Sequence, residues 1–405
     1  MRFHPPCWLV ASLLAATLTC LAACSSVGIK DTSPRSELVL PTEPTAEPDP
    51  TNGYTRAAPP ARLDFPADFG SHPDFQTEWW YYTGNLETPT GRHFGFQLTF
   101  FRRALLPPGD RPARVSNWAA DQVYLAHFTL SDIESERFLA FERSARGAVG
   151  LAGAQTDPYN VWLYGWHVQQ VGERLYKLYA AQDEITLDLQ LEDLKGPVLQ
   201  GNQGYSQKGP DPGNASYYFS QTRLSAQGTL KIGEQIYPVS GLSWMDHEFS
   251  TSALAPNQVG WDWFSLQLHA GSVDKPTGSS SQLVELMVYQ IRRKDGSIDP
   301  FSKGALILEN GTTRQLQQHD FEIQVLGTWK SPQSGAIYPS RWQVTVPSLD
   351  LDLEIEPYLK DQELNLSFTY WEGAVKIQGV FTGQAVSGSG YVELTGYADS
   401  IAGEF

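Results

Sequence analysis

Two short segments combine tryptophan with acidic residues, and they are the places where this sequence could do chemistry. The first reads EWWYYTGNL over 78–86, and the second reads GLSWMDHEFS over 241–250. A carboxyl group among aromatic side chains loses the water that stabilises its charge, so its pKa should rise. Such a group can stay protonated near neutral pH and donate a proton, as a general acid must.

Strand alternation separates the side chains of the second segment. Read as a strand, it places Trp244, Asp246 and Glu248 on one face and His247 on the opposite face. Asp246 and His247 then point to different environments, which argues against a metal cluster built from Asp, His and Glu. Asp246 is the candidate acid, and His247 is the second candidate, as a proton carrier or as an orienting group.

The same alternation divides the first segment. Glu78, Trp80 and Tyr82 share one face, which we expect to line an apolar cavity. Trp79 and Tyr81 share the other face, which we expect to pack into a core or a domain interface. The alternative for every one of these aromatics is a plain role in the core of a β-barrel.

Sequence motifs for other chemistries are missing. The chain has no Gly-x-Ser-x-Gly elbow, no phosphate-binding glycine loop and no His-Glu-x-x-His zinc motif. Its three cysteines all lie within the first 24 residues, which leaves none for a disulfide, a thiolate metal site or a catalytic thiol in the rest of the chain. We therefore predict no cofactor and no metal.

The N-terminus is typical of a bacterial lipoprotein. Residues 1–23 hold a basic start and a short apolar run, and LAAC at its end matches a lipobox, so cleavage would leave lipidated Cys24. A plain signal peptide is the alternative. Ser25 favours sorting to the periplasmic face of the outer membrane. Residues 24–60 are proline-rich and predict a flexible linker, so the membrane partner is reached through the anchor.

The remaining chain predicts strands throughout. Alternating segments such as HFGFQLTFF and ITLDLQL, separated by Gly, Pro, Asn or Asp, favour antiparallel sheets in an all-β fold. Residues 79–103 resemble 261–293, which suggests two related β domains over 61–255 and 256–405. The net charge of −16 excludes nucleic acid as an expected partner.

Six motifs together carry a resemblance to a known family. They read EWWYYTGNL, WMDHEF, WDWFSLQL, YPSRWQV, YWEG and GYVELTGY, and they span most of 70–400. This set resembles the carotenoid 1,2-hydratases and AttH-like proteins. The resemblance implies two lipocalin-like antiparallel β-barrel domains and, for the hydratases, addition of water to the terminal double bond of an acyclic carotenoid.

A hydro-lyase of that kind, or an isomerase that acts on a similar apolar molecule, needs an acid and an apolar cavity but no cofactor. The candidate cavity residues are Glu78, Trp80 and Tyr82, Trp244 beside Asp246, and Trp261, Asp262 and Trp263. Tyr205 and Lys208 lie in a glycine-rich loop that we expect either to cap a barrel mouth or to be a plain surface loop. The expected partner is an apolar, isoprenoid-like or lipid-like small molecule. A non-catalytic carrier of such molecules and a carbohydrate-binding module are the alternatives.

Overall fold

The computed structural model describes residues 53–113, 116–251, 254–270 and 282–398. All of them belong to one compact unit, Pro48–Phe405. The expected signal peptide 1–23, the lipidation site Cys24 and most of the linker lie outside the described residues. Within the described part, no helix is long and apolar enough to cross a membrane.

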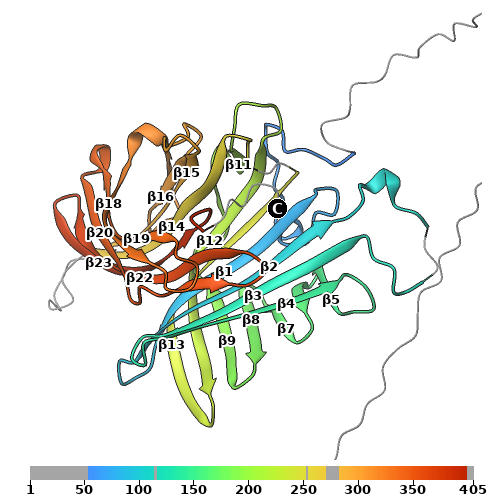
Figure 1. Cartoon of the computed structure of the whole chain (residues 1–405), viewed down its shortest axis with the longest axis horizontal. Helices are drawn as coiled ribbons and strands as arrows, with labels where there is room; N and C mark the ends of the chain where they lie inside the picture. The colour runs from blue at the N-terminus through green and yellow to red at the C-terminus, as the bar shows by residue number, and fades with distance from the viewer. Residues whose placement is uncertain (1–52, 114–115, 252–253, 271–281, 399–405) are drawn as a thin grey trace, which may run out of the picture. The chain divides into compact units, whose positions relative to one another are not determined.

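The described residues form two antiparallel sheets, drawn in blue to yellow-green and in yellow to red in Figure 1. Sheet 1 holds β1–β13, sheet 2 holds β14–β23, and the change from one to the other falls between Ser250 and Gln258. The predicted all-β fold with two lipocalin-like antiparallel barrels is confirmed; one sheet forms a nearly closed barrel and the other a half-barrel.

The strands of sheet 1 are β1 (Thr77–Glu87), β2 (His93–Ala104), β3 (Gln122–Asp132), β4 (Arg137–Arg146), β5 (Ala152–Thr156), β6 (Tyr159–Leu163), β7 (Trp166–Gly172), β8 (Leu175–Gln182), β9 (Ile185–Asp193), β10 (Val198–Leu199), β11 (Tyr205–Gln207), β12 (Ala215–Ile232) and β13 (Gln235–Ser250). Two 3-10 turns flank them, η1 (Ala67–Phe69) and η2 (Pro108–Asp110).

The strands of sheet 2 are β14 (Gln258–Ala270), β15 (Gln282–Arg293), β16 (Lys303–Ile307), β17 (Thr313–Gln317), β18 (Glu322–Lys330), β19 (Ile337–Val346), β20 (Leu351–Pro357), β21 (Glu363–Asn365), β22 (Thr369–Phe381) and β23 (Gln384–Leu394). They are accompanied by η3 (Gln318–Asp320) and η4 (Pro347–Leu349).

Both sheets follow one pairing rule. The first strand of each sheet pairs with its second strand and also with its last: β1 with β2 and β13, and β14 with β15 and β23. The two halves of the internal repeat therefore occupy the same position in their sheets, β1–β2 in one and β14–β15 in the other. In sheet 1 the path runs from β4 to β5, and β5 contacts β3.

Sheet 1 forms barrel 1 and sheet 2 forms barrel 2. Each barrel is filled by the apolar residues of its own strands. In β9, for example, Ile185, Leu187, Leu189 and Leu191 are buried while the residues between them are mostly more exposed, as period-2 alternation requires. Tryptophans contribute the largest side chains to these interiors, including Trp80 and Trp166 in barrel 1 and Trp342 and Trp371 in barrel 2.

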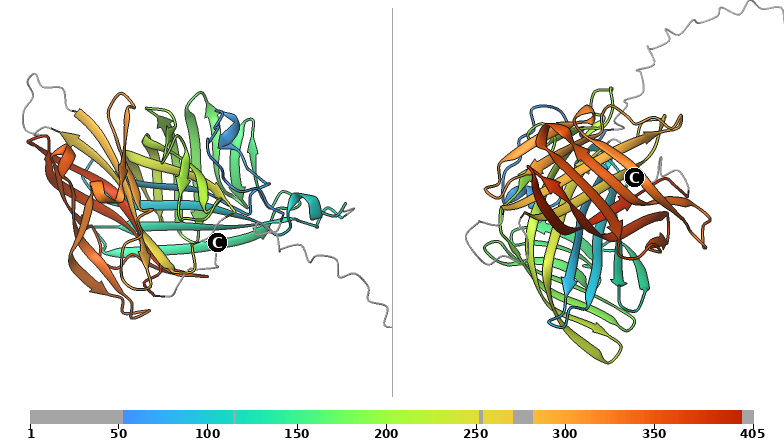
Figure 2. Two further views of the ribbon diagram at one scale, coloured as in Figure 1. Left: turned by 90° about the horizontal axis from the view of Figure 1, so that it is seen from above. Right: turned by 90° about the vertical axis from the view of Figure 1, so that its left-hand side faces the viewer.

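A third buried cluster joins the outer faces of the two sheets. It contains Tyr81 and Trp244 from sheet 1 and Trp263, Tyr289 and Tyr391 from sheet 2. The views in Figure 2 show the orange and red strands of sheet 2 beside the long strands of sheet 1. Direct bonds across this contact include Asn85 Nδ2–H to the carbonyl of Gly390 at 2.9 Å.

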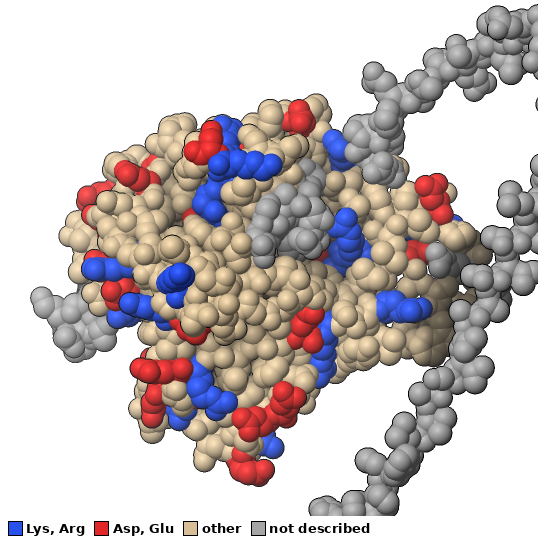
Figure 3. All heavy atoms as spheres, viewed as in Figure 1, with Lys and Arg blue, Asp and Glu red and all other residues tan. Residues whose placement is uncertain are grey.

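A buried ion cluster also crosses the contact. Glu285 of β15 has no solvent exposure, and its carboxylate accepts hydrogen bonds from Lys195 and Arg223, both of which come from the sheet 1 part of the chain. A buried carboxylate needs such partners, because an unpaired charge away from water is costly. On the face drawn in Figure 3, charges of both signs are interspersed.

Candidate active site between the two barrels

A cavity of about 110 Å³ lies where the outer faces of the sheets meet. A single buried water needs only about 10–15 Å³ by the same kind of measure, so the space suits several waters or the end of an organic molecule. Seven of its seventeen lining residues are aromatic. The lining residues that matter below are Trp79, Tyr81, Lys208, Tyr218, Asp246, Glu248, Trp261, Trp263, Tyr289 and Glu393.

Three side chains hold the carboxyl group of Asp246 by hydrogen bonds. Its Oδ1 accepts hydrogen bonds from Ser220 Oγ at 2.5 Å and from Trp244 Nε1 at 2.8 Å, and its Oδ2 accepts one from Tyr218 Oη at 2.7 Å. Burial raises the pKa of Asp246 to about 7, although these three hydrogen bonds act in the opposite direction. Near neutral pH the carboxyl can therefore both hold and release a proton.

Tyr218 connects Asp246 to the second sheet. The phenol of Tyr218 donates to Asp246 and accepts a hydrogen bond from Trp263 Nε1 at 3.1 Å. Trp263 belongs to β14 and Tyr218 to β12, so the orientation of the acid depends on side chains from both barrels. Burial, followed by the charges of Asp246 and Glu248, raises the pKa of Tyr218 well above its usual value, which keeps the phenol a donor.

Glu393 is a second acid in the same pocket and comes from β23 of sheet 2. Trp261 Nε1 donates a hydrogen bond to its Oε2 at 2.8 Å. Burial raises the pKa of Glu393 to about 7; the hydrogen bond from Trp261 opposes this rise, and the charges of Asp246 and Glu248 add to it. The pocket thus contains two carboxyl groups that titrate in the same pH range.

The third acid of the pocket, Glu248, is paired with a lysine. Glu248 Oε1 lies 2.9 Å from Lys208 Nζ and also accepts a hydrogen bond from Ser216. The Lys208 ammonium lies 4.4 Å from the ring centre of Tyr289 and 5.3 Å from that of Tyr218. These rings show that the aromatic walls of the pocket can stabilise a positive charge through their π faces.

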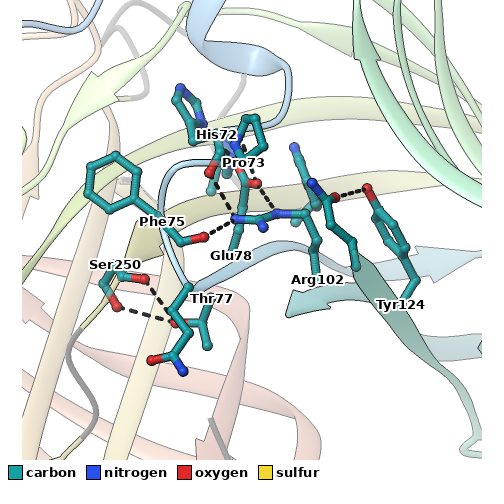
Figure 4. Close-up of polar contacts among 12 residues, drawn as sticks. His72, Pro73, Phe75, Thr77, Glu78, Arg102, Tyr124 and Ser250 are labelled. Atoms are coloured by element: carbon teal, nitrogen blue, oxygen red, sulfur yellow. Dashed lines mark hydrogen bonds and ion pairs between the residues drawn. The ribbon is translucent and has the colours of Figure 1, made fainter. Parts of the chain in front are cut away.

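A separate polar cluster lies inside barrel 1, behind the strand that carries Asp246. Glu78 is fully buried, and its carboxylate binds Arg102 Nε at 2.7 Å, His72 Nδ1 at 2.7 Å and His247 Nε2 at 2.9 Å (Figure 4 shows Glu78, Arg102 and His72). Burial alone would raise the pKa of Glu78, but Arg102 and the two histidines hold it far below its usual value.

This cluster has the spacing of a metal site but the charges of an ion network. Donor atoms of His72, Glu78 and His247 lie within 4.8 Å of one another. Burial lowers the pKa of His72, but hydrogen bonds to Asp68 and Glu78 outweigh it and raise the pKa to about 9. A protonated His72 and the Arg102 guanidinium already supply the positive charge that a metal would bring, so these residues do not fit a metal ion.

Comparison with known proteins identifies the family. The sequence profile of the AttH-like family matches residues 56–397. The chain belongs to the AttH-like family. The family resemblance seen in the sequence motifs is thereby confirmed. No curated protein matches the chain.

Two solved structures resemble this AttH-like protein over most of its length. A Nitrosomonas europaea protein described as a candidate AttH is 36% identical, with a TM-score of 0.72, and the match covers 85% of this chain and 99% of that one. Kievitone hydratase from Nectria haematococca is 16% identical, with a TM-score of 0.61, and the match covers 85% and 96% of the two chains. The second likeness shows a shared fold.

Only some of the predicted site residues of the AttH-like chain meet in the pocket. Asp246, Trp261 and Trp263 line it, and Trp244 supports Asp246 from the side. Lys208 of the glycine-rich loop also lines it, whereas Tyr205 of that loop packs against a small cluster around Phe249.

Trp79 and Tyr81 lie at the contact between the barrels, in line with the expected domain interface, but the cavity is on their face of β1 and not on the face of Glu78, Trp80 and Tyr82. Trp79 and Tyr81 line the pocket, whereas Trp80 and Tyr82 belong to the core of barrel 1 and Glu78 lies in the ion network there. The reason is that β1 is buried on both faces, so alternation alone could not say which face meets the cavity.

Two further predicted residues point away from the pocket. His247 faces the interior of barrel 1, where it stacks on Trp80 at 4.9 Å between ring centres. Asp262 binds Arg292 Nε at 2.9 Å and accepts a hydrogen bond from Tyr397, on the other face of β14 from Trp261 and Trp263. Neither contacts the cavity, and their roles are in packing and charge pairing.

Sequence reasoning missed Tyr218, Ser220 and Glu393. Glu393 did carry a signal, because it is the single acid in the otherwise uncharged motif GYVELTGY. Tyr218 and Ser220 share one face of β12, which forms a hairpin with β13. A register shift between Gln221 and Leu224 lies between the turn and Ser220, so the position of Ser220 opposite Asp246 could not be counted from the turn.

Proposed function

We propose that this AttH-like protein is a hydratase that adds water to an isolated double bond at the end of an apolar, isoprenoid-like molecule. The single observation that carries the proposal is Asp246, a buried carboxyl that titrates near neutral pH in the wall of an aromatic pocket. An acid with these properties can protonate a weak base such as an alkene without a cofactor.

The pocket supplies each requirement of acid-catalysed hydration. Protonated Asp246 gives its proton to the less substituted carbon of the alkene, and the positive charge forms on the neighbouring tertiary carbon. The aromatic faces of Trp79, Trp261 and Trp263 stabilise that cation through their electron-rich π systems. Water then forms the new C–O bond to the cation and loses one proton, so alkene and water give a tertiary alcohol.

The fold provides a precedent for this choice. The solved structure from Nectria haematococca is named a kievitone hydratase, so hydration is a reaction performed on this two-barrel fold. The low identity limits the comparison to the fold, and for that reason the proposal for this chain depends on the pocket residues. A carrier that binds the same class of molecule without changing it is the second candidate, because the same apolar walls would hold such a ligand.

Mass spectrometry of bound and released molecules tests the proposal. We would incubate the full chain, solubilised in detergent, with a total lipid and pigment extract of its host. A new species heavier by one water, absent with the Asp246→Asn variant, is the expected result. An unchanged apolar molecule held equally by both proteins would establish the carrier instead.

We also propose that the protein is anchored in the cell envelope through lipidated Cys24. The basis is the lipobox sequence alone, since Cys24 lies outside the described residues. Incorporation of labelled palmitate into the wild type but not into a Cys24→Ala variant is the expected result. Equal labelling of both proteins, or labelling of neither, would contradict the anchor.

A further inference from the structure

We propose that Glu393 is the second catalytic carboxyl of this pocket and removes the proton from the water that captures the cation. The assignment rests on the proposed hydration and names the residue that completes it. Asp246 supplies a proton from the wall formed by sheet 1, and Glu393 receives one at the wall formed by sheet 2. The catalytic centre would then exist only where the two barrels meet.

Asp246 and Glu393 both line the pocket and come from different sheets. Asp246 belongs to β13, and Glu393 belongs to β23, where it lies directly opposite Trp263 of β14 in the strand register. Trp263 is in turn hydrogen-bonded to Tyr218, which holds Asp246. Tyr218 and Trp263 therefore connect the two carboxyls along the wall of the cavity.

The other acids at or near the pocket already have polar partners. Glu248 already contacts Lys208 and accepts a hydrogen bond from Ser216. Glu372 accepts hydrogen bonds from Tyr81 Oη at 2.7 Å and Gln97 Nε2 at 3.2 Å, and burial together with the charge of Glu393 raises its pKa well above the usual range. Glu372 does not line the cavity, and both of its carboxyl oxygens already accept hydrogen bonds. Among the acids that the structure describes at this pocket, Glu393 is the one left to act as base.

The mutual influence of the two carboxyls favours opposite protonation states. The charge of Asp246 raises the pKa of Glu393, and two acids that face one low-dielectric space resist simultaneous ionisation. At neutral pH the pair can hold protonated Asp246 together with ionised Glu393. After one turnover the states are exchanged, with Asp246 ionised and Glu393 protonated, and exchange with solvent water restores the starting pair.

Deuterium labelling separates the step of Asp246 from the step of Glu393. The full chain would be incubated in D₂O with lycopene in detergent micelles and, separately, with 6-methylhept-5-en-2-one, both of which end in a trisubstituted alkene. Deuterium in recovered alkene reports protonation and reversal, because Asp246 can take a proton back from the cation. Deuterated tertiary alcohol reports capture by water.

Glu393→Gln should reduce alcohol formation by about 10²-fold or more while deuterium still enters the recovered alkene. Asp246→Asn should abolish both signals. Glu393→Asp, which keeps a carboxylate, should restore part of the alcohol. Glu372→Gln is the matched control: it replaces a buried acid that does not line the cavity by an amide of similar shape and should leave the ratio of alcohol to exchange unchanged.

The possible outcomes distinguish the two proposals. A wild-type protein that yields neither signal with either probe would overturn the hydratase proposal and the role of Glu393 with it. Hydration by the wild type that Glu393→Gln leaves intact would overturn the role of Glu393 alone. Equal loss of exchange and alcohol in Glu393→Gln, with no rescue by Glu393→Asp, would make Glu393 a structural residue.

Discussion

Asp246 and His247 are consecutive in the chain, yet their side chains lie in two separate buried environments. Asp246 faces the pocket between the barrels, and His247 faces the interior of barrel 1, where its Nε2 lies 2.9 Å from Glu78. One strand of sheet 1 therefore separates the proposed catalytic acid from an ion network that supports the fold. Substitutions at the two positions should have different consequences.

The first prediction separates chemistry from stability. Asp246→Asn keeps the shape of the side chain but removes the proton donor, so turnover should fall by about 10²–10⁴-fold while ligand binding and folding persist. Turnover by mass spectrometry and urea unfolding of the same preparation would measure both. His247→Gln should instead lower the free energy of unfolding by about 1–3 kcal/mol, because it disturbs a buried hydrogen bond to Glu78. Turnover retained by Asp246→Asn would refute the assignment.

The second prediction concerns the pH dependence of turnover. Asp246 must be protonated to act, and burial raises its pKa to about 7, so the rate should fall as the pH rises above about 7. Glu393 must be ionised, and its pKa is also raised to about 7, so the rate should fall below that pH as well. A narrow bell centred near pH 7 is expected for kcat. Whatever rate remains in Glu393→Gln should lack the acidic limb, and an unaltered bell in that variant would contradict the pairing.

The third prediction concerns the ion network inside barrel 1. Arg102→Met removes the guanidinium that binds Glu78, and both side chains are fully buried. The remaining buried carboxylate should cost about 3–5 kcal/mol of unfolding free energy, measured by urea denaturation. Arg341, whose pair with Glu354 is about half exposed, provides the control: Arg341→Met should change stability by less than about 1 kcal/mol. Equal effects of the two substitutions would show that burial of the pair does not matter.

The fourth prediction concerns His72 and the stability of the fold in alkaline solution. The pKa of His72 is raised to about 9 in the folded protein, against an ordinary value of 6.5. Because the folded value is the higher one, the stabilisation is complete below pH 6.5 and is lost as the pH rises through 9. The shift corresponds to about 3 kcal/mol. The difference in stability between wild type and His72→Gln should shrink accordingly between pH 6 and pH 10, and a constant difference would exclude this linkage.

Alternation in the sequence was sufficient for the strands and for several residues of the site. The separation of Trp244 and Asp246 from His247 follows directly from period 2 and is found in the structure. The all-β fold and the AttH-like family could also be predicted. These properties depend on neighbouring residues and on motifs that lie within single segments.

The remainder depends on long-range pairing. Which face of β1 meets the pocket is decided by the position of barrel 2, whose Trp263 and Glu393 pack against that side. Glu78 was expected at the cavity because it shares a strand face with Trp80 and Tyr82, but its partner Arg102 comes from β2 and holds it inside barrel 1. A strand buried on both sides gives no local sign of which partner it will meet.

The small volume of the pocket limits which parts of a substrate the protein can distinguish. A space of about 110 Å³ admits the tip of a long hydrocarbon and not its whole length. Both barrel interiors are occupied by their own tryptophans and leucines. Substrates of different length that share one terminus should therefore react at similar rates. A change of a single methyl group at that terminus should alter the rate more than ten carbons added at the far end.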